Sequence, residues 1–104
     1  MSGMILVYVV CANQDEAKKI SRHLLEQRLA GCTNTFPIES AYWWEGKIVE
    51  DSEAVLIVKT VEPNFDKVKE AVLQQHSYTT PAIFSIPVTH VEEKYSKWLC
   101  GEIG

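Results

Sequence analysis

Three side chains in this sequence carry the ligand atoms that soft or borderline metal ions prefer. Cys11 ends an apolar run, Cys32 follows Gly31, and His76 precedes the segment 77–81. Thiolate and imidazole groups suit copper and zinc, so Cys11, His76 and Cys32 are candidate ligands for Cu²⁺ or another divalent cation. Their spacing matches no recognised metal motif, so only the fold can bring them together.

Each of these residues also has a purely structural interpretation. Cys11 closes a predicted strand and Cys32 opens another, and cysteine often serves as a small buried apolar residue in such places. His76 is predicted to end a helix, where the helix dipole favours a charged imidazole. The sequence leaves the metal-site and structural interpretations open.

Acidic residues in the middle of the chain offer oxygen ligands to a hard cation. A run of charges on a hairpin is more often a solvated face, and we favour that interpretation for Glu39, Glu50, Asp51 and Glu53. The sequence contains no Ser-His-Asp order, no G-x-S-x-G, no H-E-x-x-H and no glycine-rich phosphate loop. It therefore supports neither an enzyme nor an organic cofactor.

Length, charge and cysteine content narrow the class of protein. The chain has 104 residues and a net charge of −4, without the basic face that nucleic-acid binding requires. Its three cysteines form no C-x-x-C pair, which argues against a disulfide framework and for a reducing, cytoplasmic location. We read no signal peptide and no apolar run of ~20 residues, so direct membrane insertion is not expected. We expect one domain over residues 1–104.

The candidate residues must be positioned by strands and helices whose patterns are clear. Residues 4–12 form an apolar, β-branched run typical of a central strand. Asn13 and Glu16 have capping-box spacing at the start of a helix that Gly31 is expected to end. The later elements are a β-hairpin over 32–61, a helix from near Pro63 to about His76-Ser77, a strand over 82–88, and a third helix with Thr89 and Glu92 as its capping box.

The order of these elements is βαββαβ with a further helix at the end. That order predicts an α+β, ferredoxin-like split-βαβ fold, in which helices cover one face of an antiparallel sheet. The second face of the sheet is then left to solvent, to a ligand or to a partner.

The predicted hairpin is unusually long, with arms of about a dozen residues against the usual five or six. Its tip is therefore expected to project beyond the sheet. Phe36, Ile38, Tyr42 and Trp44 share one side of its first arm, and Trp43 lies on the other. Exposed edges and apolar surface favour association, so the hairpin predicts a closed cyclic assembly. A stacking platform for a ligand is the alternative.

Such an assembly also predicts clefts between subunits. We interpret Tyr42, Trp43 and Trp44 as assembly residues at the tip of the hairpin. His76, Tyr78, Lys59 and Trp44 are the expected lining of an inter-subunit cleft. A structural role for these residues is an equally open interpretation.

Several short motifs occur in a specific order along the chain. They are Cys11 followed by DEA at 15–17, QRLAGC at 27–32, YWWEGKI at 42–48, Lys59-Thr60, HSYTTP at 76–81, Pro87-Val88, Tyr95 and Trp98. In this order and spacing, the chain resembles the CutA divalent-cation tolerance proteins from about residue 5 to residue 99. The resemblance implies a ferredoxin-like fold, a homotrimer whose hairpins cross between subunits, and an architecture similar to the PII signalling proteins. It also implies a link to tolerance of copper or other divalent metals and, in animal relatives, to anchoring of acetylcholinesterase at membranes. The family has no established catalytic reaction.

Two departures from the family pattern bear on the predicted site. The family usually has acidic residues after the tyrosine, in a pattern like H-x-Y-E-x-P-E-I, where this chain has Thr79 and Ala82. Many bacterial relatives carry a His-His pair where this chain has Gln75-His76. A metal site that uses those carboxylates or two adjacent imidazoles is weakened here.

These observations favour a trimeric CutA-type protein that acts in tolerance of divalent metal ions and binds copper or a similar cation. The alternative is a PII-like sensor or adaptor that holds a small metabolite or a partner protein in its inter-subunit clefts. An RNA-recognition-like βαββαβ module is disfavoured, because the chain is acidic and lacks the expected mid-sheet aromatic pairs with flanking basic residues.

Overall fold

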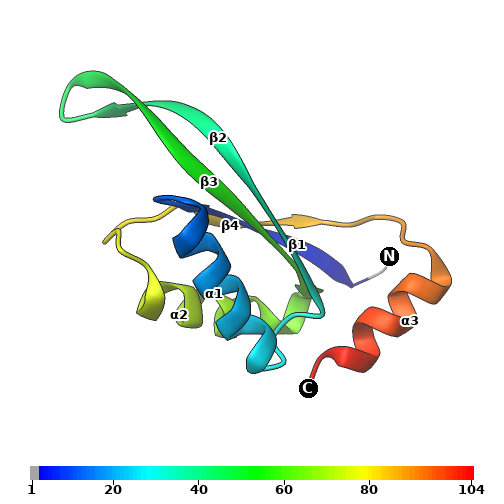
Figure 1. Cartoon of the computed structure of the whole chain (residues 1–104). Coiled ribbons are helices and arrows are strands. Elements are labelled where there is room, and N and C mark those ends of the chain that lie inside the picture. Colours follow the sequence, from blue (N-terminus) through cyan, green and yellow to red (C-terminus); the bar gives the residue numbers. More distant parts are fainter. Residues whose placement is uncertain (1–2) are drawn as a thin grey trace.

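A computed structural model describes residues 3–104 and has the predicted ferredoxin-like α+β fold (Figure 1). The four strands form one antiparallel sheet in the order β2-β3-β1-β4. The strands are β1 (Met4–Cys11), β2 (Cys32–Trp44), β3 (Lys47–Val61) and β4 (Ile83–Pro87). The helices are α1 (Gln14–Glu26), the one-turn 3₁₀ helix η1 (Glu62–Asn64), α2 (Phe65–Gln75) and α3 (Glu93–Glu102).

The hydrophobic core lies between the sheet and the pair α1 and α2, which cover the same face (Figure 1). Alternate residues of β1 point into this core, because side chains along a strand alternate between its two faces. The fully buried residues include Val7, Val9 and Cys11 of β1, Leu56 and Val58 of β3, Ile20 and Leu24 of α1, and Val68 and Val72 of α2. In each helix, residues three or four positions apart thus form one inward-facing stripe.

Helices α1 and α2 leave the other face of the sheet uncovered, as the sequence predicted (Figure 1). Tyr8 stacks on its cross-strand neighbour Phe84, with ring centroids 4.9 Å apart. Phe84 remains 48% exposed, and Ile86 and Phe36 remain 42% and 39% exposed. An apolar surface of this kind favours association with another molecule.

The β2-β3 hairpin extends well beyond the rest of the sheet (Figure 1). Its turn consists of Glu45 and Gly46, whose φ angles of 49° and 78° suit a two-residue turn that follows the twist of the strands. The register pairs Trp44 with Lys47, which leaves Trp43 on the opposite side of the ribbon. Trp43 and Trp44 are 72% and 59% exposed, so the predicted projection of the tip and its parity are confirmed.

The predicted end of the first helix was wrong. Helix α1 ends at Glu26 rather than Gly31, and the chain then turns through Arg28, which has a φ of 58°. Gly31 is required instead by a close approach, because a Cβ there would lie 2.6 Å from Leu99 Cδ1 and 3.2 Å from the Leu99 carbonyl oxygen.

The capping predictions had mixed outcomes. Asn13 caps α1 as predicted, since its Oδ1 accepts a hydrogen bond from the Glu16 N–H at 2.8 Å. Thr89 does not cap α3; Glu92 does so itself, because its carboxylate accepts from the N–H groups of Lys94 and Tyr95. Helix α2 begins at Phe65, after the proline-containing η1, and ends at Gln75.

Within residues 3–104, no helix has both the length and the apolar character needed to cross a membrane.

The contact between Gly31 and Leu99 provides a test of how α3 is attached to the sheet. We expect Gly31→Ala to lower the free energy of unfolding by about 1–3 kcal/mol, as overpacking usually does. Gly101→Ala, in α3 with nothing within 4 Å of its added Cβ, is the matched control and should be neutral or stabilising by about 0.5–1 kcal/mol. Chemical denaturation of the three proteins measures both effects. Equal stability of Gly31→Ala and the wild type would contradict the described docking of α3.

Candidate functional site

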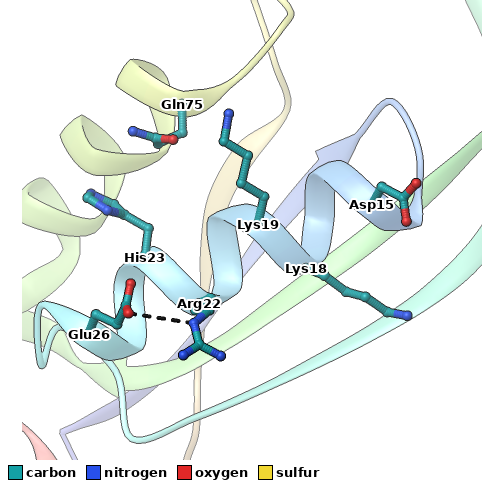
Figure 2. A pocket seen from close by; sticks show the side chains of 7 residues that line it. All are labelled: Asp15, Lys18, Lys19, Arg22, His23, Glu26 and Gln75. Carbon is teal, nitrogen blue, oxygen red and sulfur yellow. Dashed lines mark ion pairs between the residues drawn. The ribbon is translucent and has the colours of Figure 1, made fainter.

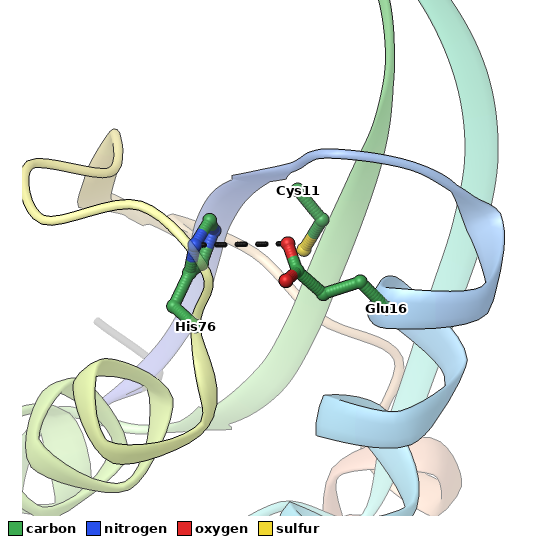
Figure 3. A group of neighbouring side chains, drawn as sticks. All are labelled: Cys11, Glu16 and His76. Carbon is green, nitrogen blue, oxygen red and sulfur yellow. Dashed lines mark ion pairs between the residues drawn. The ribbon is translucent and has the colours of Figure 1, made fainter.

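Cys11, Glu16 and His76 converge beside the last residues of β1 (Figure 3). Cys11 is the final residue of β1, Glu16 lies in the first turn of α1, and His76 immediately follows α2. One potential ligand atom from each residue lies within 4.8 Å of the others. Segments that are far apart in the sequence thus bring a thiol, a carboxylate and an imidazole to one place.

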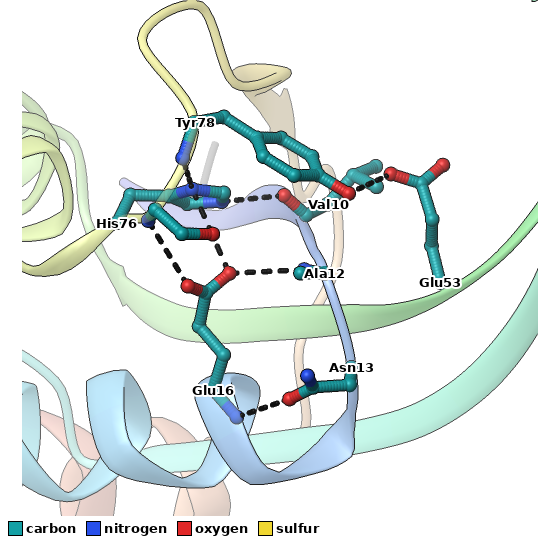
Figure 4. Close-up of polar contacts among 8 residues, drawn as sticks. Val10, Ala12, Asn13, Glu16, Glu53, His76 and Tyr78 are labelled. Atoms are coloured by element: carbon teal, nitrogen blue, oxygen red, sulfur yellow. Dashed lines mark hydrogen bonds and ion pairs between the residues drawn. The ribbon is translucent and has the colours of Figure 1, made fainter.

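Glu16 connects three segments through hydrogen bonds (Figure 4). Its Oε1 accepts from the Ala12 N–H at 2.9 Å, and its Oε2 accepts from the Ser77 N–H at 3.0 Å. Its own N–H donates to Asn13 Oδ1. The carboxylate therefore holds the end of β1 and the start of α1 against the turn that follows α2.

The pKa of Glu16 reflects these contacts. Burial acts to raise the pKa of this carboxyl, but hydrogen bonds from Ala12 and Ser77 outweigh burial and lower the pKa below its ordinary value of 4.5. Hydrogen bonds to a carboxylate favour its charged form. Glu16 is thus an anion at neutral pH, and its charge contributes to the stability of the site.

His76 uses both of its ring nitrogens within the protein (Figure 4). Nε2 lies 2.7 Å from the Val10 carbonyl oxygen, which only accepts, so Nε2 carries the proton. Nδ1 accepts from the Tyr78 N–H at 3.0 Å, and it also lies 3.6 Å from Glu16 Oε1. The side chain is fully buried. These contacts assign the neutral Nε2–H tautomer.

Cys11 is a protonated thiol in this conformation. Burial, and secondarily the charges of Glu16 and Glu53, raise its pKa to about 12. Its ordinary pKa is 9.0, and the thiolate rather than the thiol is the metal ligand. Metal binding at Cys11 must therefore release a proton.

The donor set fits a divalent ion of borderline softness. A thiolate, an imidazole and a carboxylate suit Cu²⁺ or Zn²⁺, and three protein ligands leave a position open for solvent or a ligand. The lone pair on His76 Nδ1 faces Glu16, and it already accepts a hydrogen bond from the Tyr78 N–H. Coordination by Nδ1 thus requires the Tyr78 N–H to move away.

The structure does not bring Cys32 into this group. Cys32 pairs with Lys59 in β3, whereas Cys11 pairs with Ala54, five residues away along the same strand. At about 3.4 Å per residue, this register places Cys32 too far away to share an ion with Cys11 in one chain. Within one chain Cys32 therefore does not join Cys11 and His76, and its role as a metal ligand stays a prediction.

The predicted cleft residues separate into two places in one chain. Tyr42, Trp44 and Tyr78 line a common cleft. Lys59 lies toward the other end of the sheet, with its Nζ 5.7 Å from the centre of the Tyr95 ring. Within one chain Lys59 does not line this cleft, and its place between subunits stays a prediction.

A second surface hollow lies between α1 and the end of α2 (Figure 2). Most of its seven lining side chains are charged, and Arg22 forms an ion pair with Glu26 at 3.5 Å in which both side chains are largely exposed. Solvated pairs of this kind contribute little, so we assign no site there.

Glu16 is the functional candidate that sequence reasoning missed. The spacing of Asn13 and Glu16 predicts only a capping box, in which the Glu16 carboxylate reaches back to the N-cap residue. In the structure it reaches Ala12, one residue earlier, and also the distant Ser77. The capping signal was thus the available clue, although it did not indicate the second partner.

The lowered pKa of Glu16 predicts a specific pH dependence of stability. Glu16→Gln should lower the free energy of unfolding by about 1–2 kcal/mol at pH 7, because it replaces a charged acceptor of two hydrogen bonds. A group with a depressed folded-state pKa stabilises fully above its unfolded pKa, near 4.5 here, and this stabilisation disappears as pH falls through the lower folded value.

Denaturant unfolding at pH values from 7 to 3 measures this difference. The gap between wild type and Glu16→Gln should shrink toward pH 3, while Glu26→Gln, at the exposed pair with Arg22, should differ little from wild type throughout. A gap for Glu16→Gln that does not change with pH would refute the assigned role of its charge.

The chain matches known proteins over nearly its whole length. A model of the CutA1 divalent ion tolerance protein family matches residues 5–102. The divalent-cation tolerance protein CutA of Thermotoga maritima is 46% identical over 96 residues, which cover 92% of this chain and 95% of that protein. The corresponding protein of Archaeoglobus fulgidus is 42% identical over 93 residues, covering 89% and 91%.

Solved structures of similar proteins have the same fold as this chain. The periplasmic divalent cation tolerance protein CutA from Archaeoglobus fulgidus superimposes with a TM-score of 0.95 at 39% identity, covering 97% of this chain and 99% of that chain. CutA1 from Oryza sativa gives a TM-score of 0.94 at 37% identity, covering 97% and 94%. The sequence motifs, the fold and these matches together show that this chain belongs to the CutA1 family of divalent ion tolerance proteins.

Proposed function

We propose that this protein contributes to divalent-cation tolerance by binding Cu²⁺ or Zn²⁺ through Cys11, Glu16 and His76. The observation that carries the proposal is the convergence of these three side chains within 4.8 Å. The family name links relatives of this chain to divalent cations, and the donor types suit a borderline ion. We propose a non-enzymatic role, because the site offers ligands without a catalytic arrangement.

The residues of the site must rearrange for binding. Cys11 gives up its thiol proton, and the turn at 76–78 shifts so that the Tyr78 N–H leaves His76 Nδ1. The Nε2–H bond to Val10 can persist, which keeps the imidazole oriented and its Nδ1 lone pair directed at Glu16. Glu16 retains acceptor capacity beyond its two backbone hydrogen bonds. The bound ion supplies a positive charge that compensates the two anions, Glu16 and the Cys11 thiolate.

We further propose that the protein assembles as a homotrimer through its hairpins. The uncovered apolar face of the sheet and the exposed aromatic residues at the hairpin tip support this proposal. A closed cyclic assembly would bury both surfaces. The family match does not favour the alternative of a PII-like sensor or adaptor.

A reducing compartment such as the cytoplasm is the location that we propose. All three cysteines are free thiols, and Cys100 is exposed, which suits a reducing environment. The Archaeoglobus fulgidus relative, in contrast, is described as periplasmic.

Metal titration tests the proposed site. We expect Cys11→Ser/His76→Ala to bind Cu²⁺ and Zn²⁺ at least tenfold more weakly than wild type in calorimetry. The control is Cys100→Ser/His90→Ala, which removes the same ligand types from exposed positions and should remain within about twofold of wild type. If the site variant binds as well as wild type, the site is wrong.

The raised pKa of Cys11 adds a pH signature to the same titration. Because this pKa is about 12, binding should release about one proton at every pH between 7.5 and 9, so affinity should rise about tenfold per pH unit. Titrations in buffers of different ionisation enthalpy count the protons. Cys11→Ser should lose this proton release, and its retention would exclude Cys11 as a ligand.

Light scattering tests the assembly proposal. We expect Trp44→Glu to dissociate the trimer or lower its thermal stability, because it places a charge on the apolar side of the hairpin. Leu73→Glu, at an apolar residue of α2 that is 41% exposed, is the control and should leave the assembly unchanged. A Trp44→Glu protein that remains trimeric with undiminished thermal stability would rule out this role for the hairpin.

A further inference from the structure

A cleft separate from the candidate metal site lies between the hairpin and the loop after α2. It has a volume of about 690 Å³, within the range of small-molecule pockets. Its lining comes from the hairpin, from Val10 of β1 and from the segment 77–82. The lining residues are Val10, Ser40, Ala41, Tyr42, Trp44, Glu53, Ser77, Tyr78, Thr79, Thr80 and Ala82.

Glu53 is the one charged side chain among the described residues that line this cleft. It is only 8% exposed. Its Oε2 accepts from the Tyr78 hydroxyl at 2.7 Å (Figure 4), but no lysine, arginine or histidine within residues 3–104 forms an ion pair with it. A carboxylate buried without a cationic partner is unfavourable, so Glu53 favours a cation from outside the chain.

The walls of the cleft also suit a cation. Tyr42 and Trp44 come from the hairpin, and Tyr78 comes from the opposite side. Aromatic rings attract cations through the negative potential of their faces, and the attraction is larger in a desolvated site. Hydroxyl groups of Ser40, Thr79 and other lining residues provide neutral hydrogen-bond acceptors.

The carboxylate of Glu53 gives the cleft a negative charge. Its Oε2 accepts a hydrogen bond from the Tyr78 hydroxyl at 2.7 Å, and none of the other described lining residues is charged. The cleft therefore disfavours anions.

A metal ion is a poor match for this cleft. Hard divalent cations take six or more oxygen ligands from carboxylates, carbonyls and water, and Glu53 is the only carboxylate among the described residues of the lining. The described lining residues also include no thiol and no imidazole. A single positive charge on an organic group with an apolar stem matches the one carboxylate, the aromatic walls and the volume.

We propose that this cleft binds a small organic cation, whose primary ammonium or guanidinium group donates to Glu53 while its apolar part packs against Tyr42, Trp44 and Tyr78. This binding is distinct from metal binding at Cys11, Glu16 and His76, and it requires that the hairpin contacts of the proposed homotrimer leave the cleft side of Tyr42 and Trp44 open. Ala82 and Thr79 leave this side of the lining free of a second carboxylate, which makes a monocation the matching charge.

Calorimetry and amide NMR with n-butylammonium, in metal-free buffer, test the proposal. We expect saturable binding with shifts at Tyr78 and Thr79, and at least tenfold weaker binding of the neutral isostere n-butanol and of the anion butyrate. Because these three probes are compared on the wild-type protein, the result does not depend on any variant folding correctly. Absence of saturable binding, or equal binding of n-butanol, would overturn the proposal.

Two variants locate the charge that matters. Glu53→Gln should weaken n-butylammonium at least tenfold. Glu50→Gln removes an equal charge from the same strand, but on the opposite side of the ribbon, and should change affinity less than twofold. Equal weakening by both variants would indicate a general electrostatic effect and refute the site, as would a structure in which a side chain of another copy fills the cleft.

Discussion

The carboxylate of Glu16 is the contact on which the arrangement of the site depends. It accepts hydrogen bonds from Ala12 at the end of β1 and from Ser77 after α2. Without it, the turn at 76–78 would have only the His76 contacts to β1. A charged acceptor of two backbone N–H groups contributes more than a neutral one, and the same carboxylate is a ligand of the right type for a divalent ion. The Glu16 carboxylate thus stabilises the metal-free structure and is also a ligand in the proposed metal-bound form.

Tyr78 links the two proposed binding sites. Its N–H donates to His76 Nδ1, and its hydroxyl donates to Glu53 in the neighbouring cleft. His76 Nδ1 has a single lone pair, so it cannot accept the hydrogen bond from Tyr78 and coordinate a metal ion at the same time. If metal binding moves the Tyr78 backbone, it would therefore also move the Tyr78 ring, which lines the cleft. The two proposed sites differ in their chemistry but share Tyr78.

The sequence predicted the fold well, because periodicity reports burial directly. The alternation in β1, the inward stripe of α1 and the parity of Tyr42 and Trp44 all follow from local pattern. It failed where a distant contact decides the outcome. Gly31 is fixed by Leu99, and Glu16 is fixed in part by Ser77; neither contact leaves a local signature. Ligand type groups Cys32 with Cys11, although strand register separates them within one chain.

The central claim is that a metal ion displaces the Tyr78 N–H from the Nδ1 lone pair of His76. Crystals grown with Cu²⁺ or Zn²⁺, with anomalous scattering to locate the ion, test it most directly. The account predicts one ordered ion bound by Cys11 Sγ and His76 Nδ1, with the hydrogen bond from Tyr78 broken. Anomalous peaks confined to exposed residues such as His90 or Cys100, with the 76–78 turn unchanged, would contradict it.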